Sequence, residues 1–264
     1  MTEIKVPPNH PRAKSLQIRE KLTEHYLEGI VAVSGLIAHG RGEAFDYLLG
    51  EKTNKPALEA MVAAAAMLLT SENPVISVNG NTAALVPGEI VKLAKVTEAK
   101  IEVNLFYRSL ERELTIKKLL EKAGAHGVLG VGEKASARIP ELSSERRRVD
   151  PRGILAADVV MVPLEDGDRT EALVKMGKKV IAIDLNPLSR TAQKATITIV
   201  DNIVRAAPRL AQTAQKLKKQ GVRKCREILL NFDNKKNLAE TITLMKENLS
   251  RFAEKSAPTT SEGE

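Results

Sequence analysis

A dense group of polar side chains follows a short apolar run near residue 184. The run, Ile181 to Ile183, is typical of a central strand in a parallel sheet. The group that follows it consists of Asp184, Asn186, Ser189, Arg190 and Thr191. Ligands of open α/β sheets bind at the carboxyl ends of the strands, where an arginine supplies a fixed positive charge and a planar fork of donors. This stretch therefore predicts a site for a ligand that bears phosphate and ribose groups.

Polar residues also follow other predicted strands. They are Asn79 to Asn81, Asn104, Glu165 to Glu171, and Asp201 with Asn202. The carboxylates of Glu165, Asp166 and Asp168 could hold Mg²⁺ or receive a substrate amine. Asp168 could instead be only the N-cap of the next helix, with Glu171 completing a capping box. That role would leave Glu165 and Asp166 without an explanation. A ligand site at the carboxyl ends of the strands is therefore a better interpretation than helix capping alone.

A glycine-rich segment near residue 40 offers a second place for an anion. Two of its glycines have the spacing of a P-loop, but Arg41 and Gly42 stand where Lys and a hydroxyl residue are required. A dinucleotide fingerprint is also incomplete, because Phe45 replaces its third glycine. What remains is a predicted turn in which Gly40 and Gly42 let backbone N–H groups approach an anion that Arg41 pairs with. His39 could donate to a phosphate or act as a general base, and a plain surface turn is the alternative.

The order of apolar runs predicts the fold class. From Pro74 onward strands and helices alternate, which is the pattern of a parallel sheet with helices on both faces. A helical segment precedes the sheet, and basic helices follow it. The expected strands are 75–78, 101–105, 128–129, 158–162, 179–183 and 196–200. We expect an α/β protein with one domain over residues 1–254 and a disordered polar tail over 255–264.

One connection in this pattern is long. The segment from Gly130 to Arg152 shows little periodicity, so it predicts a mobile lid or an arm. It carries three consecutive arginines, Arg146 to Arg148. These could contact a phosphate, or they could form a solvated charge run.

Composition excludes several classes of function. The chain has 264 residues, a formal net charge of +8, 43% hydrophobic residues and 3% aromatic residues. Base stacking on aromatic platforms is therefore not expected, and we predict no nucleic-acid partner despite the basic C-terminal helices. Cys225 is the single cysteine, which rules out an internal disulfide and predicts a role in helix packing. No apolar run reaches the ~18 residues of a membrane span and no signal peptide is visible, so no membrane contact and a cytoplasmic location are expected.

Several blocks of the sequence resemble the archaeal phosphopantothenate synthetases, a family also called 4-phosphopantoate–β-alanine ligases. The resemblance runs in order from about His10 to Pro208. The blocks are His10–Arg12, Arg19–Lys21, Gly35–Tyr47, Pro74–Asn81, Glu102–Tyr107, Val162–Leu173, Ile183–Ala192 and Ile197–Arg205. The segment from Gly124 to Val149 does not match clearly and the basic C-terminal helices match only loosely, so neither carries a functional inference.

The resemblance implies an activity, a fold and a set of contacts. The implied activity is an amide-forming ligase of coenzyme A synthesis that joins 4-phosphopantoate to β-alanine. ATP would be cleaved to AMP and diphosphate through an acyl-adenylate, on a Rossmann-like fold in a homodimer. The implied ATP contacts are Arg19, Arg41, Asp184, Leu185, Asn186, Arg190, Thr191, Asn202 and Ile203.

The residue types fit this chemistry. A carboxylate that attacks the α-phosphorus approaches a polyanion, and Arg19 and Arg41 with Mg²⁺ are natural sources of positive charge. The candidates for binding the phosphorylated substrate are Gly40, Gly42, Asn79, Asn81 and Asn104. The candidates for handling the β-alanine amine are His39, Glu165, Asp166 and Asp168, and the sequence does not choose between them. The alternative function is another ATP-dependent α/β enzyme, such as a small-molecule kinase.

Overall fold

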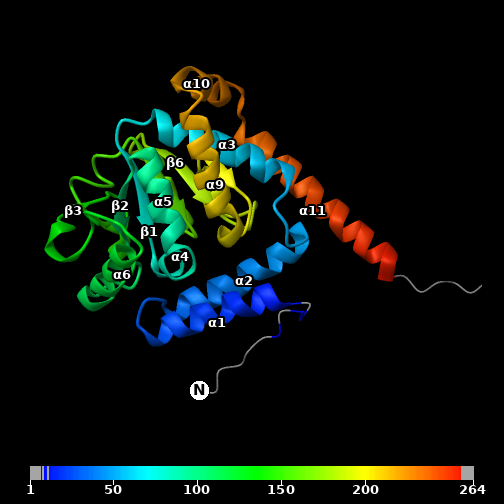
Figure 1. The fold of residues 1–264 in the computed structure, drawn as a ribbon, viewed down its shortest axis with the longest axis horizontal. Helices are drawn as coiled ribbons and strands as arrows, with labels where there is room; N and C mark the ends of the chain where they lie inside the picture. The colour runs from blue at the N-terminus through cyan, green and yellow to red at the C-terminus, as the bar shows by residue number, and fades with distance from the viewer. Residues whose placement is uncertain (1–6, 8, 11, 257–264) are drawn as a thin grey trace, which may run out of the picture.

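The computed structural model describes residues 7, 9–10 and 12–256 of the chain. Its centre is a five-stranded parallel sheet in the order β2-β1-β5-β6-β7 (Figure 1). The strands are β1 (Pro74–Val78), β2 (Lys100–Val103), β5 (Val159–Pro163), β6 (Lys179–Ile183) and β7 (Ile197–Ile199). These predicted strands are confirmed, whereas 128–129 contributes only an isolated bridge from Leu129 to Glu102.

The strand order places a crevice in the middle of the sheet. After β2 the chain crosses back over β1 and continues through β5, β6 and β7, so the order reverses between β1 and β5. This is one of the common doubly wound orders, and ligands bind at such a switch point, outside the carboxyl ends of the strands. The predicted Rossmann-like parallel sheet is confirmed in this form.

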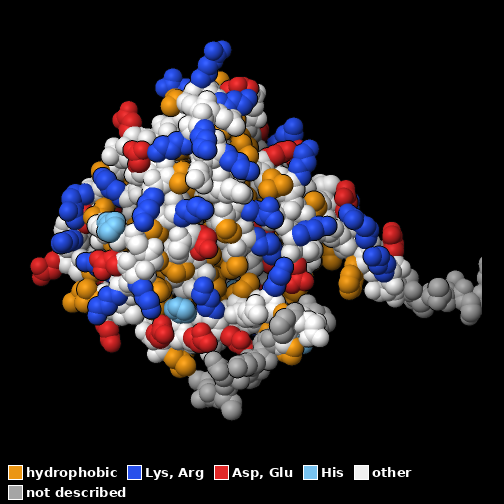
Figure 2. Space-filling view, viewed as in Figure 1, with side chains coloured by type: hydrophobic (Ala, Val, Ile, Leu, Met, Phe, Trp, Pro, Cys, Tyr) orange, Lys and Arg blue, Asp and Glu red, His pale blue; other side chains and the backbone are white. Residues whose placement is uncertain are grey.

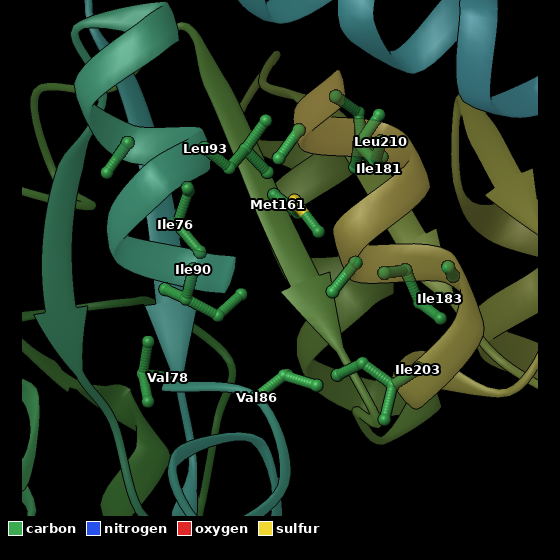
Figure 3. Close-up of a cluster of buried hydrophobic side chains, with 14 of the residues drawn as sticks. Ile76, Val78, Val86, Ile90, Leu93, Met161, Ile181, Ile183, Ile203 and Leu210 are labelled. Atoms are coloured by element: carbon green, nitrogen blue, oxygen red, sulfur yellow. The ribbon is translucent and has the colours of Figure 1, made fainter. Parts of the chain in front are cut away.

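Helices cover both faces of the sheet, as predicted. The helices of one face are α3 (Lys55–Thr70), α5 (Pro87–Thr97) and α9 (Ile203–Lys218), and α7 (Gly167–Lys175) lies on the other. On the first face Ile76 of β1, Met161 of β5 and Ile181 of β6 point into the same apolar cluster (Figure 3). On the second face Val160 of β5 packs with Leu173 of α7. Each strand is therefore buried on both sides, which explains its continuous apolar sequence.

The N-terminal segment folds into two helices beside the sheet. They are α1 (Ala13–Leu27) and α2 (Val33–Leu49). α2 is one continuous helix of 17 residues, so the turn predicted from Gly40 to Gly42 is wrong. A glycine in a helix interior costs only about 1 kcal/mol relative to Ala, and the part of α2 that follows the glycines is fixed by ion pairs from Glu43 and Asp46 to distant arginines. A helix uses its interior N–H groups internally, so those of the two glycines are not free to bind an anion.

The connection over residues 124–157 packs onto the sheet instead of extending as a lid or an arm. It contains the short antiparallel pair β3 (Ala137–Arg138) and β4 (Arg148–Val149). Ile139 and Ile154 are buried on the face that also carries α7. The buried carboxylate of Glu102 accepts hydrogen bonds from the N–H of Asp150 at 2.9 Å and of Ile154 at 2.6 Å. These contacts cross long distances in the sequence, so the weak local periodicity did not reveal them.

The other helices complete the molecule. They are α4 (Gly80–Leu85), α6 (Leu110–Lys122), α8 (Arg190–Lys194), α10 (Val222–Asn231) and α11 (Asn234–Ser256). α11 extends away from the sheet towards the C-terminal end (Figure 1). Cys225 of α10 lies in the main core, as predicted. The predicted disordered tail lies outside the described residues apart from Lys255 and Ser256, which belong to α11.

Basic side chains are spread over the face of the molecule that carries α3, α10 and α11, with acidic side chains between them (Figure 2). Lys224 pairs with Glu227 at 2.9 Å, and Lys236 lies 4.0 Å from Glu240. This dispersed arrangement favours a solvated helical face over a single basic patch. Within residues 12–256, no helix has the length and apolar character needed to cross a membrane.

Candidate active site

A cavity of about 620 Å³ lies at the switch point between β1 and β5. The turns after β1, β5, β6 and β7 form one side of it, and α2 forms another wall. We call it the main cavity. The predicted site residues that line it are His39, Arg41, Gly42, Asn79, Asn81, Asp166, Asp184, Leu185, Asn186, Arg190, Thr191, Asn202 and Ile203. The fold thus brings together groups from both halves of the chain.

Some predicted site residues lie elsewhere. Arg19 and Gly40 line a second cavity, of about 350 Å³, between α1 and α2. Asp168 lines a third cavity, of about 380 Å³, beside α7. Asn104 lines none of these, and its buried amide donates to two backbone carbonyls of the 124–157 connection at 3.2 and 3.0 Å. Asn104 is therefore an anchor for that connection, and the substrate contact proposed for it is not supported by its position.

The turn after β6 is shaped by its own side chains. Asp184 accepts hydrogen bonds from the N–H of Asn186 at 2.9 Å and from the hydroxyl of Ser189. Asn186 accepts one from the N–H of Leu188 at 2.9 Å, and Ser189 caps α8. Short polar side chains commonly bond to nearby backbone in this way. The turn is therefore pre-shaped, with the Asn186 amide on the cavity wall.

Arg41 is the cation of α2 that faces this turn. Its side chain is exposed, lines the main cavity and makes no ion pair with any of the described residues. Burial raises the pKa of Asp184 above its usual value, and the nearby charge of Arg41 opposes that rise. The Arg41 guanidinium is therefore available to an anionic ligand.

The asparagines after β1 hold the walls of the cavity in place. Asn79 caps α4 by accepting the N–H of Thr82 at 3.0 Å, and its amide donates to the carbonyls of Pro163 and Leu164 at 3.0 Å each. The oxygen of this side chain therefore fixes the start of α4, and its nitrogen joins the end of β1 to the end of β5. Asn81 donates to the carbonyl of Gly35 at 2.8 Å, where a larger residue than glycine would collide with the Asn81 amide. These bonds place α2 close to the switch point.

A cluster of buried charges lies at the start of α7. The side chain of Glu165 is only 2% exposed and pairs with Arg146 and with Arg169. Burial alone would raise the pKa of Glu165, but these two arginines hold it below its usual value. Glu165 is therefore a structural anion, charged and fully engaged.

Asp166 differs from its neighbour. It caps α7 by accepting the N–H of Arg169 at 2.9 Å, so the helix cap is Asp166 and not Asp168. Its other carboxylate oxygen lies 3.1 Å from Nε of Arg146 without a hydrogen bond to it. Burial, followed by the charge of Glu165, raises the pKa of Asp166. Among the acidic residues after β5, Asp166 is the one that combines a raised proton affinity with a place on the wall of the main cavity.

Residues 56–248 match the family described as phosphopantothenate/pantothenate synthetase. The chain belongs to this family. It is 53% identical to the 4-phosphopantoate–β-alanine ligase of Thermococcus kodakarensis, over 95% of this chain and 96% of that protein. It is 52% identical to the ligase of the same name from Methanosarcina mazei, over 96% of this chain and 98% of that protein. A third relative of that name, from Thermococcus onnurineus, is 53% identical over 95% of this chain and 96% of its own length.

In this member of the synthetase family, α2 is tied to the end of β7. Arg205 of α9 bonds to Asp46 of α2 at 2.5 and 3.0 Å and to Asp201 at 2.6 and 2.9 Å. The amide of Asn202 caps α9 with its oxygen and donates to Asp46 at 3.0 Å with its nitrogen. The position of Arg41 in the cavity therefore depends on a hydrogen-bond network with Asp46 at its centre.

His39 lies between the main cavity and the second cavity and lines both. Burial lowers the pKa of its imidazole, so the neutral form is favoured near pH 7. In the second cavity Arg19 binds Glu43 through two hydrogen bonds, at 2.9 and 2.8 Å, and Tyr47 donates to the same carboxylate at 2.5 Å. The Arg19 guanidinium is thus paired with a carboxylate of α2, and Arg19 lies beside the main cavity and not in its lining.

The sequence analysis missed one arginine of the cavity and left the role of another open. Arg112 of α6 donates to the carbonyls of Gly29 and Ile30 at 3.0 and 2.8 Å, and no local pattern marks it because its partners are distant backbone groups. Arg146 is not part of a solvated charge run, since its side chain is 10% exposed and lines the main cavity. Within the described ranges, no group of three or more His, Cys, Asp or Glu side chains is arranged to hold a metal ion.

Proposed function

We propose that this chain joins 4-phosphopantoate to β-alanine, with cleavage of ATP to AMP and diphosphate, as a step of coenzyme A synthesis. The observation that carries the proposal is the 53% identity to a ligase of that name over 95% of the chain. The main cavity supports it, because its volume of about 620 Å³ is that of a site able to enclose a substrate-sized ligand.

In the first step, an oxygen of the 4-phosphopantoate carboxylate attacks the α-phosphorus of ATP. The bond from that phosphorus to the diphosphate oxygen breaks, diphosphate leaves, and an acyl-adenylate remains. Negative charge moves onto the phosphate oxygens, so a cation held nearby lowers the barrier. We assign this role to Arg41, whose guanidinium is not neutralised by a described carboxylate.

We place ATP along the turns after β6 and β7. The proposed contacts are Asp184, Leu185, Asn186, Arg190, Thr191, Asn202 and Ile203, with Arg41 at the phosphates. Mg²⁺ in phosphoryl-transfer sites binds through substrate phosphates and one or two carboxylates, and Asp184 is the acidic side chain of the main cavity to which we assign this role. Arg19 lines only the second cavity, which shares His39 with the main cavity. We therefore place Arg19 at the edge of the ATP site.

In the second step, the amine of β-alanine attacks the acyl carbon and the bond to the AMP phosphate breaks. The ammonium group must lose one proton before the attack and a second one after it. Asp166, with its raised pKa, and neutral His39 are the two proposed acceptors. We further propose that the protein acts as a cytoplasmic homodimer, and exposed apolar side chains such as those of Leu27, Ile37 and Leu110 are available for contacts between subunits.

The test is a product assay with purified protein, ATP, Mg²⁺, 4-phosphopantoate and β-alanine, read by mass spectrometry. We expect AMP and 4′-phosphopantothenate, each dependent on both organic substrates. Omitting β-alanine should leave phosphopantoate-dependent exchange of labelled diphosphate into ATP. Formation of ADP would instead identify a kinase and would overturn the proposal.

A further inference from the structure

The arginines that line the main cavity are Arg41, Arg112, Arg146 and Arg190. Two of them, Arg146 and Arg190, are paired with carboxylates. The other two, Arg41 and Arg112, make no ion pair with any of the described residues. The proposed ligase brings two separate phosphorylated groups into this cavity, the triphosphate of ATP and the phosphate of the acid substrate. Arg41 is assigned to the triphosphate, so Arg112 is left for the second group.

Arg112 is half-buried in the first turn of α6. Its guanidinium donates to the carbonyls of Gly29 and Ile30 at 3.0 and 2.8 Å. It also donates to the carbonyl of Tyr107. These three bonds fix the guanidinium and leave two of its five N–H groups, one on each terminal nitrogen. The two that remain can donate to phosphate oxygens.

The protein does not balance the charge of Arg112. Carbonyl groups carry only partial charges, and burial lowers the pKa of Arg112 with no carboxylate close enough to oppose that shift. Of the two glutamates in the same turn, Glu113 pairs with Arg108, and Glu111 makes no ion pair with Arg112. A cation taken out of water without a counter-ion costs free energy, so this part of the cavity favours an anionic ligand.

Arg112 lies against the turn after β1. A Cβ at Gly80 would lie 3.3 Å from Nη2 of Arg112, so the glycine lets the guanidinium approach that turn closely. Arg41 instead faces the turn after β6. The two cations therefore belong to different halves of the crevice, which suits two substrates bound side by side.

The start of α2 adds uncapped donors near Arg112. The N-cap residue is Ala32, and no side chain caps this helix of 17 residues. The first N–H groups of a helix have no internal acceptor and carry the positive end of its dipole. Ala32, Ser34 and Gly35 line the main cavity, and Arg112 binds the carbonyl of Ile30 two residues before the N-cap. The helix start thus adds to the positive potential that Arg112 provides.

The residues expected from the sequence to bind the phosphorylated substrate are engaged in other contacts. The side-chain nitrogens of Asn79, Asn81 and Asn104 all donate to backbone carbonyls. The N–H groups of Gly40 and Gly42 lie inside α2. These residues therefore build the walls of the site and leave the charge of the phosphate to a cation.

We infer that Arg112 is the specificity-determining residue for the phosphate of the acid substrate, so that the phosphorylated acid is preferred to the free hydroxy acid. This inference rests on the proposed ligase function and assigns one recognition contact within the same cavity. With the phosphate at Arg112, the carboxylate at the other end of the acid is free to attack the α-phosphorus near Arg41. No bond to the phosphate of the acid forms or breaks, so Arg112 acts on binding and not on the chemical step.

The experiment measures exchange of labelled diphosphate into ATP with 4-phosphopantoate and with pantoate, which lacks the phosphate. The variant is Arg112→Gln, which removes the charge and keeps a polar side chain. The matched control is Lys118→Gln, which removes one positive charge from an exposed position of the same helix. The thermal midpoint of each variant checks the fold.

We expect Arg112→Gln to raise the KM for 4-phosphopantoate about tenfold or more, the effect of losing one charge-assisted contact. The KM for ATP, the maximal exchange rate and the rate with pantoate should stay as they are, because none of them depends on that contact. Lys118→Gln should change none of these values. An unchanged KM for 4-phosphopantoate in Arg112→Gln, or an equal loss with both acids, would overturn the assignment.

A second variant, Arg112→Lys, keeps the charge but loses the planar fork of donors. Its KM for 4-phosphopantoate should lie between those of the unmodified protein and of Arg112→Gln. If Arg112→Gln does not fold, an unchanged preference for the phosphorylated acid in Arg112→Lys overturns the assignment. Absence of exchange with either acid in the unmodified protein would overturn the proposed function instead, so the two failures are distinguishable.

Discussion

The two sides of the main cavity are built in different ways. The turns after β6 and β7 are held by bonds between near neighbours, such as Asp184 to the N–H of Asn186 and Asn202 to the N–H of Val204. The wall formed by α2 is held by residues far away in the sequence, such as Arg205 at Asp46. The first side is pre-shaped locally, whereas the position of Arg41 on the second depends on tertiary contacts.

The largest effect should come from the cation on the α2 wall. Arg41→Ala should reduce phosphopantoate-dependent diphosphate exchange on the order of 10²-fold, because one charge on the reacting phosphates is lost. The fold should be unaffected, since Arg41 is exposed and makes no ion pair with the described residues. The thermal midpoint checks the fold, and Arg209→Ala, on the exposed side of α9, is the control. Near-normal exchange in Arg41→Ala would remove this residue from the site.

The network that places α2 should be the next most sensitive. Arg205→Met leaves the buried carboxylates of Asp46 and Asp201 without their cation, so we expect a loss of about 3 kcal/mol in the free energy of unfolding. Because α2 loses its tie to β7, the KM for ATP should rise as well. Urea unfolding and exchange kinetics measure the two effects. Arg251→Met, which disturbs only an exposed pair with Glu247, should change neither.

The packed 124–157 connection is a further region that depends on distant partners, among them the buried carboxylate of Glu102. Burial raises the pKa of Glu102 to about 7 from its usual value of 4.5. An acid whose folded-state pKa is raised stabilises the fold fully below its unfolded pKa, and this contribution is lost as the pH rises through the folded pKa. The free energy of unfolding should therefore fall by roughly 2–3 kcal/mol between pH 4.5 and 7 on account of Glu102.

Glu102→Gln should lack this part of the pH dependence. Denaturant unfolding at pH 5 and at pH 8 measures it as the difference between the variant and the unmodified chain. Glu227→Gln, an exposed position on α10, is the control. The same pH dependence in Glu102→Gln and in the unmodified chain would show that Glu102 is not the titrating group.

The smallest effect should come from the local side of the cavity. Ser189→Ala removes the cap of α8 and a hydroxyl donor to Asp184, which should cost about 1 kcal/mol in the free energy of unfolding. Ser109→Ala removes the corresponding cap from α6, which contributes Arg112 to the main cavity but no residue to the turns after β6 and β7. Both variants should lose similar stability, but only Ser189→Ala should raise the KM for ATP. Equal KM values would mean that the turn keeps its shape without the cap.

Elements with a strong local signal were predictable. The strand over 179–183 was expected with its observed bounds, and the polar turn after it was predicted to be a ligand site because polar residues and an arginine follow the carboxyl end of that strand. Asp166 was among the candidates for the same reason. The choice between Asp166 and Asp168 was not possible, since one lies at a cavity junction and the other at an exposed pair with Arg190.

Elements that depend on distant partners were not predictable. The glycines at 40 and 42 suggested a turn, because nothing near them in the sequence shows that Asp46 and Glu43 anchor a continuous helix. The 124–157 connection looked irregular, because its anchor is a glutamate on another strand. For Arg146 the sequence left a phosphate contact and a solvated charge run as alternatives, and the choice between them required Glu165 and Asp166 to be placed beside it.

The sequence by itself determined the parallel sheet, the polar edge where its strands end, and the resemblance that names the chemistry. Apolar periodicity and side-chain-to-backbone bonds act over a few residues, so they can be read along the chain. Only the tertiary structure decided which charges are neutralised and which of them line a cavity. Burial and ion pairing set these properties, and both depend on groups that meet only when the chain folds.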